Sequence, residues 1–120
     1  MTGLKARQCS ARWINCVRGD IHHLRAARGA KGNEQTGGRY AVVVQADDLM
    51  LSTLLVAPTS QSAQPRSFRP TITVANEPTQ VLVEQTAAVA PERLGRLVGH
   101  VSRHELEDIN DALRLALELD

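Results

Sequence analysis

The stretch that decides the fold is residues 37–61, GGRYAVVVQADDLMLSTLLVAPTSQ. It contains two apolar runs, residues 40–44 and 51–57, which are separated by the polar residues 45–48. Each run is short, rich in Val and Leu and bounded by turn residues, which is typical of a buried strand rather than a helix. We therefore expect two neighbouring strands that pair as an antiparallel hairpin.

Such a hairpin would bring two polar side chains to one edge of the sheet. Arg39 precedes the first strand, and Thr59 and Ser60 follow the second. An antiparallel pair places the start of one strand near the end of its partner, so the guanidinium of Arg39 would lie near the hydroxyl of Ser60. Both groups donate hydrogen bonds to phosphate oxygens, which makes this edge a candidate phosphate site.

Composition predicts one small domain. The chain has 120 residues, and 42% of them are hydrophobic, enough for a modest core. No apolar run approaches the roughly 20 residues that span a membrane, and the polar N-terminal segment is not typical of a secretory signal. We expect a cytoplasmic protein. Cys9 and Cys16 are the only cysteines, too few for a disulfide scaffold, and we expect free thiols.

The charge is small overall but uneven along the chain. The formal net charge is +1, yet residues 1–75 carry 10 Lys/Arg and 4 Asp/Glu. Residues 76–120 carry 4 Lys/Arg and 9 Asp/Glu. This distribution predicts a basic surface that suits an anionic partner. The aromatic residues are Trp13, Tyr40 and Phe68, which argues against recognition by rows of stacking aromatics.

The rest of the chain predicts more short strands and one helix. Strands are expected at residues 21–24, 71–74, 81–89 and 94–101, with a turn at residues 90–93. Ser102-x-x-Glu105 is a capping box, which predicts a helix from 102 to about 117. This order predicts a mainly β protein with helices, in which a strongly bent antiparallel sheet or small barrel packs against a C-terminal helix.

Two segments differ from this regular pattern. Residues 1–17 show no clear period and are expected to be partly mobile. Residues 26–38 form a long Gly-rich loop, and loops of this length in a compact domain are often functional.

In this order the segments resemble the MazF/PemK/Kid family of toxins. The similarity runs from Arg18 to Leu119 and rests on six short motifs. They are similar to the family's RGDI at residues 18–21, KGSEQ at 31–35, RPxxVV at 39–44, VxPxT[ST] at 56–61, xDQ/EQ at 83–85 and RLxxxIG at 93–99. The resemblance implies an SH3-like barrel with a C-terminal helix (MazF/Kid/CcdB-like) over residues 18–120, preceded by an extension at 1–17.

Some positions depart from the family pattern. Tyr40 stands where proline is usual, and His22 where an aromatic residue is usual. Thr86-Ala87 stands where an aliphatic and a basic residue are common. Ser60 stands in place of a threonine, and a register slip of one residue would give its role to Thr59.

The resemblance implies the toxin component of a toxin–antitoxin system. Family members of this kind are metal-independent, sequence-selective endoribonucleases that cleave single-stranded RNA to 2′,3′-cyclic phosphate and 5′-OH ends and so inhibit translation. We therefore expect no metal, no cofactor and no membrane association. The implied partners are RNA, a second copy of the chain in a homodimer, and a MazE-like antitoxin.

The implied reaction assigns roles to three residues. Attack by the ribose 2′-OH needs a proton acceptor, stabilisation of charge on phosphorus, and a donor for the leaving oxygen. Arg39 is expected to stabilise the phosphate, Ser60 to hydrogen-bond a phosphate oxygen, and Glu34 to accept or orient the proton. Candidate RNA-binding residues are Arg25, Arg28, Lys31, Gln61, Arg66, Arg69 and Gln85.

Two other functions remain open at this point. CcdB toxins share the fold but inhibit DNA gyrase, and a fold alone does not decide function. Tyr40 and Ala87 also fit a family member that is weakened in catalysis and only binds antitoxin or RNA.

Overall fold

The computed structural model describes residues 16–25 and 39–119. The strands are β1 (Asp20–Leu24), β2 (Tyr40–Val43), β3 (Leu54–Ser60), β4 (Thr71–Val74), β5 (Glu77–Val81), β6 (Ala87–Val89) and β7 (Leu94–His100). The helical elements are the 3-10 turns η2 (Val83–Gln85) and η3 (Pro91–Arg93) and the helix α1 (Arg103–Leu117). The Gly-rich loop 26–38 and most of the extension 1–17, both discussed above, lie outside the described residues.

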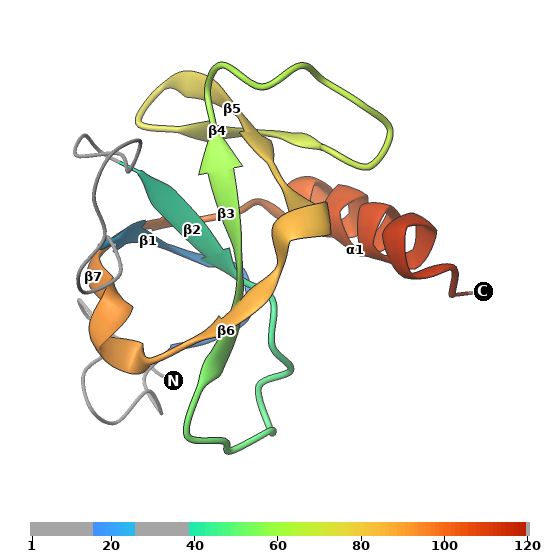
Figure 1. The fold of residues 1–120 in the computed structure, drawn as a ribbon. Coiled ribbons are helices and arrows are strands. Elements are labelled where there is room, and N and C mark those ends of the chain that lie inside the picture. The colour runs from blue at the N-terminus through green and yellow to red at the C-terminus, as the bar shows by residue number, and fades with distance from the viewer. Residues whose placement is uncertain (1–15, 26–38, 120) are drawn as a thin grey trace, which may run out of the picture.

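All strand pairs are antiparallel, in the order β4-β5-β3-β2-β1-β7. β3 is the centre of the sheet, because β2 pairs along one edge while β6 and β5 pair with the first and second halves of the other. The sheet curls into a half-barrel, and α1 lies to one side of it (Figure 1). The expected mainly β fold, a strongly bent antiparallel sheet with a C-terminal helix, is confirmed.

Side chains of β2 are buried on both faces of the sheet. Val42 packs in the cluster that includes Ile109 of α1, whereas Ala41 and Val43 pack in a second cluster with Leu94. Strands buried on both faces have continuous apolar sequences rather than alternating ones. This explains why residues 40–44 form an unbroken apolar run.

The RGDI-like motif has a structural role. The guanidinium of Arg18 donates to the carbonyl of Val44 and to Oδ1 of Asn110 in α1. Gly19 has φ +95°, and a Cβ there would lie 2.8 Å from Cε1 of His100. Only glycine combines this conformation with so close a neighbour. The motif therefore joins the start of β1 to β7 and α1.

The capping box at the start of α1 is confirmed. Ser102 Oγ accepts from Glu105 N at 3.0 Å, and Ser102 N donates to Glu105 Oε1 at 2.8 Å. The second carboxylate oxygen of Glu105 accepts from Thr73 N at 2.9 Å, which attaches the helix to β4. The helix buries Ile109 fully but leaves Leu117 62% exposed, so its apolar face extends past the core.

Two strand predictions need correction. The single strand expected at 81–89 is wrong, because β5 already ends at Val81 and η2 separates it from β6. Ala75 and Asn76 have φ values of 52° and 67°, which form the tight turn of a β4–β5 hairpin. The strand expected at 51–57 instead runs from Leu54 to Ser60.

Cys16 differs from what the sequence predicts. Cys16 is disulfide-bonded, so the expectation of a free thiol is wrong for this residue, while Cys9 lies outside the described residues. In the described segments, no helix has the length and apolar character needed to cross a membrane.

Candidate active site

The register of β2 and β3 decides where Arg39 and Ser60 lie. Ala41 pairs with Pro58, and Thr59 Oγ1 donates to the carbonyl of Tyr40 at 3.0 Å. Continued by two residues beyond the Ala41–Pro58 pair, this register would set Arg39 opposite Ser60 on one face of the sheet. Both residues are partly exposed. They therefore lie at the same end of the β2–β3 pair, which we call the rim.

The end of β1 belongs to the same rim. Leu24 N donates to the carbonyl of Arg39 at 2.9 Å, so Arg25 follows directly beside it. The Arg25 guanidinium donates to the carbonyl of Glu92 at 2.5 Å, and Arg93 Nε donates to the carbonyl of Arg25 at 2.7 Å. Carbonyls are neutral acceptors, so these bonds orient Arg25 without cancelling its charge.

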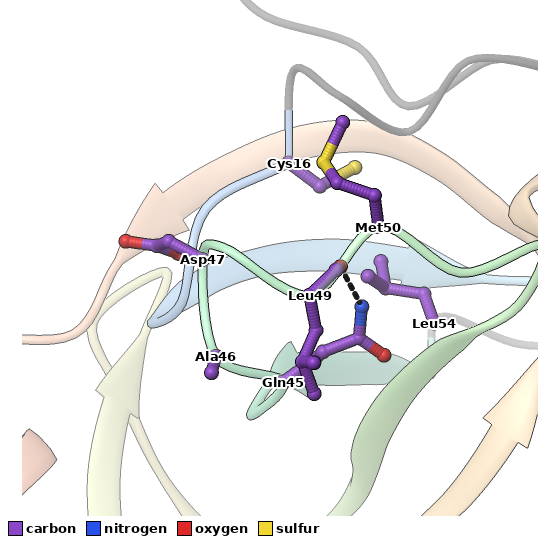
Figure 2. Close-up of a pocket in the computed structure, with 7 residues that line it drawn as sticks. All are labelled: Cys16, Gln45, Ala46, Asp47, Leu49, Met50 and Leu54. Atoms are coloured by element: carbon purple, nitrogen blue, oxygen red, sulfur yellow. Dashed lines mark hydrogen bonds between the residues drawn. The ribbon is translucent and has the colours of Figure 1, made fainter.

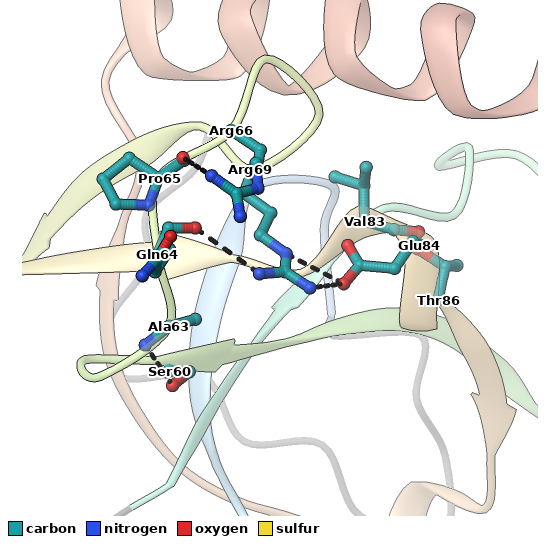
Figure 3. Close-up of polar contacts among 9 residues, drawn as sticks. All are labelled: Ser60, Ala63, Gln64, Pro65, Arg66, Arg69, Val83, Glu84 and Thr86. Carbon is teal, nitrogen blue, oxygen red and sulfur yellow. Dashed lines mark hydrogen bonds and ion pairs between the residues drawn. The ribbon is translucent and has the colours of Figure 1, made fainter.

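The hydroxyl of Ser60 is oriented by the turn that follows β3. Its Oγ accepts from Ala63 N at 3.0 Å and from Ser62 N at 3.2 Å, and Figure 3 shows the first of these bonds. A hydroxyl has two acceptor positions and one proton. Ser60 Oγ also lies 3.3 Å from Oγ of Ser62. With both acceptor positions used, the Ser60 proton is the one that can go to Ser62 Oγ, and a phosphate oxygen would take the place of that acceptor.

Thr59 lies in a different environment from its neighbour. It is 2% exposed, and its hydroxyl bonds the Tyr40 carbonyl. Consecutive residues of a strand face opposite sides of the sheet. In this structure, therefore, Ser60 rather than Thr59 shares a face with Arg39.

Arg69, a candidate RNA contact, is engaged within the protein. Its Nε and Nη2 donate to Oε2 of Glu84 at 3.0 and 2.8 Å (Figure 3). Its Nη1 donates to the carbonyl of Gln64 at 3.4 Å, and its guanidinium lies 5.4 Å from the ring centroid of Phe68. The carboxylate of Glu84 therefore offsets the positive charge with which Arg69 would attract a phosphate.

Some of the other candidates are described and exposed, and the rest fall in the undescribed loop. Gln61, Arg66 and Gln85 are exposed. Gln61 follows β3 directly, and the guanidinium of Arg66 donates to the carbonyl of Pro65 at 3.5 Å. The remaining candidates lie outside the described residues, namely Glu34, Arg28 and Lys31.

A small pocket lies at the other end of the β2–β3 pair (Figure 2). Its volume is about 60 Å³, and Cys16, Gln45, Met50 and Leu54 are among its lining residues. Pockets that hold small-molecule ligands measure about 300–1,000 Å³, so a nucleotide does not fit. Within residues 16–25 and 39–119, no three His, Cys, Asp or Glu side chains gather as metal ligands.

The curled sheet and the C-terminal helix form a small barrel-type domain with a basic rim. Residues 17–117 match the family described as PemK-like, MazF-like toxin of type II toxin-antitoxin system, and the chain belongs to this family. The candidate toxin Rv3098A of Mycobacterium tuberculosis is 33% identical over 104 residues, which are 86% of this chain and 98% of that protein. The family predicted from the sequence is confirmed.

Solved structures share the fold. The Mycobacterium tuberculosis toxin MazF-mt6 aligns with a TM-score of 0.68 and 18% identity, covering 84% of this chain and 98% of that chain. A mycobacterial endoribonuclease in complex with its cognate antitoxin gives a TM-score of 0.70 and 16% identity, covering 87% and 96%. MazF of Deinococcus radiodurans aligns with a TM-score of 0.67 and 18% identity, covering 85% of this chain and 96% of that chain. These identities establish a common architecture.

Proposed function

We propose that this toxin is a metal-independent, sequence-selective endoribonuclease that cleaves single-stranded RNA and thereby inhibits translation. The observation that supports the proposal is the β2–β3 register, in which Ala41 pairs with Pro58; continued by two residues, it would bring Arg39 opposite Ser60 at a partly exposed rim. Mycobacterial structural neighbours named as endoribonucleases support the same reaction class.

In the proposed reaction, the ribose 2′ oxygen attacks the adjacent phosphorus. The O2′–P bond forms and the P–O5′ bond breaks, which leaves a 2′,3′-cyclic phosphate and a 5′-OH. Arg39 stabilises the negative charge on the pentacoordinate phosphate and is our candidate donor to the leaving oxygen. Ser60 donates its proton in a hydrogen bond to a non-bridging oxygen. Glu34 is our candidate acceptor of the 2′ proton.

RNA binding is assigned to the charged and amide side chains around the rim. Among the described residues, Arg25 and Arg66 bond neutral carbonyls that leave their charges available for phosphates, contacts that position RNA without reading its sequence. Gln61 and Gln85 can hydrogen-bond bases or ribose. Arg28 and Lys31 of the undescribed loop complete the proposed set. DNA lacks the attacking 2′-OH and is not cleaved.

We also propose that the toxin works in the cytoplasm as a homodimer and is inhibited by a MazE-like antitoxin. Large apolar side chains remain exposed on this chain, and such surfaces are typical of protein interfaces. They are Leu49, Met50, Leu51 and Leu55 around the start of β3, and Leu115, Leu117 and Leu119 at the end of α1. An acidic antitoxin segment would complement Arg25 and Arg39 at the rim.

The proposal is tested by incubating the purified protein with a long single-stranded RNA in EDTA. Arg39→Ala and Ser60→Ala are compared with the matched controls Arg114→Ala and Ser52→Ala, which alter exposed residues away from the rim. We expect wild type and controls to cleave and both rim variants to lose at least about 10²-fold in rate. Intact RNA with the wild-type protein would contradict the proposal, and gyrase inhibition by the same sample would indicate a CcdB-like function.

A further inference from the structure

We infer that Arg69 and Glu84 are positioning residues that hold the Ser60 hydroxyl in place at the rim, and that Arg69 is not an RNA contact. This inference rests on the proposed function for its catalytic consequence. Its structural part can be measured without RNA.

A continuous series of contacts joins the ion pair to Ser60 (Figure 3). Glu84 Oε2 lies 2.8 Å from Nη2 of Arg69, and Nη1 of the same guanidinium reaches the carbonyl of Gln64 at 3.4 Å. The neighbour of Gln64 in the chain is Ala63, whose N–H holds Ser60 Oγ at 3.0 Å. Arg69 thus fixes the loop segment that orients the hydroxyl.

The backbone around Glu84 is held in place by the core and by the sheet. Its neighbour Val83 is 3% exposed and packs in the core. The carbonyl of Val83 accepts from Oγ1 of Thr86 at 2.8 Å, and Leu82 N donates to the carbonyl of Pro58 in β3 at 2.9 Å. The ion pair therefore connects the exposed loop 61–70 to a 3-10 turn that is anchored on the sheet.

The same geometry argues against a phosphate contact at Arg69. Nε, Nη1 and Nη2 all have partners within the protein, and one partner is a carboxylate that already satisfies the cation. RNA would have to displace Glu84 and would meet its negative charge. Arg66, in the same loop, has among the described residues the carbonyl of Pro65 as its side-chain partner and remains the better phosphate contact.

The inference predicts how Glu84→Gln and Arg69→Gln behave. Amide hydrogen exchange at Ala63 should become about fivefold faster in both variants, since a partly exposed ion pair contributes modestly. RNA cleavage should show kcat reduced about tenfold with KM unchanged, because a misplaced hydroxyl weakens the transition state more than substrate binding. Arg69→Lys should resemble Arg69→Gln, because one ammonium cannot replace the guanidinium fork.

The matched control is Asp111→Asn, which breaks the exposed Arg114–Asp111 pair (2.8 Å) on α1 and should change neither readout. Unchanged exchange at Ala63 in Glu84→Gln would overturn the inference. So would a raised KM at constant kcat in Arg69→Gln with full activity in Arg69→Lys, which would assign Arg69 to phosphate binding. A wild-type protein that leaves RNA intact would remove the proposed function, while the exchange data would still decide the positioning role.

Discussion

Deleting the two neighbouring hydroxyls of β3 one at a time should separate stability from catalysis. Thr59→Val keeps the shape of the side chain but leaves the Tyr40 carbonyl without its 3.0 Å partner. An unsatisfied acceptor in a buried setting costs about 1–2 kcal/mol, so the free energy of unfolding should fall by that amount. RNA cleavage should stay within about twofold, because this hydroxyl faces away from Arg39.

Ser60→Ala should give the opposite result. Its Oγ accepts hydrogen bonds from the N–H groups of Ser62 and Ala63 in an exposed turn. Because water can replace this acceptor, the free energy of unfolding should fall by about 0.5–1 kcal/mol. Loss of its hydrogen bond to the reacting phosphate should lower kcat about 10²-fold.

Urea unfolding followed by circular dichroism measures the free energy of unfolding, and cleavage of a fluorescent RNA in EDTA at 25 °C measures kcat. Both variants should be folded at that temperature, because single domains have about 5–15 kcal/mol of stability. Inactive Thr59→Val together with fully active Ser60→Ala would refute the assignment. Thr59 would then be the catalytic hydroxyl.

Three further outcomes are expected. Ser102→Ala removes the capping box and should lower the free energy of unfolding by about 1 kcal/mol, and an unchanged urea midpoint would contradict this. Gly19→Ala should destabilise by about 2 kcal/mol or more in thermal unfolding, because φ is +95° and the added Cβ would lie 2.8 Å from His100. Wild-type Tm for Gly19→Ala would count against the close approach. Sedimentation should give twice the chain mass, shifted towards the monomer by Leu117→Glu, and a wild-type monomer would refute the dimer.

Local signals predicted much of the fold. The capping box needs only Ser102 and Glu105, and the apolar run at 40–44 needs only its own composition. The β4–β5 hairpin was missed because Asn76 and Pro78 are typical of loops, whereas here Asn76 adopts a left-handed turn and Pro78 lies inside β5. Such a turn is stabilised by strand pairing that no short sequence window contains.

The arrangement of the candidate site residues was harder to predict from the sequence than the fold. Arg39 and Ser60 could be placed at one rim because antiparallel pairing of adjacent strands requires it. The choice between Thr59 and Ser60 depends on which strand face meets the core, and that choice needed the observed register. The Arg69–Glu84 pair spans 15 positions with no local pattern, so Arg69 looked like a free cation in the sequence.

The most direct test of the central claim is mass spectrometry of the RNA ends produced in EDTA by the wild-type protein and by Arg39→Ala. We expect 2′,3′-cyclic phosphate and 5′-OH ends from the wild type, and at least about 10²-fold less of them from Arg39→Ala. Fragments with 3′-OH and 5′-phosphate ends, or equal cleavage by the variant, would contradict the account.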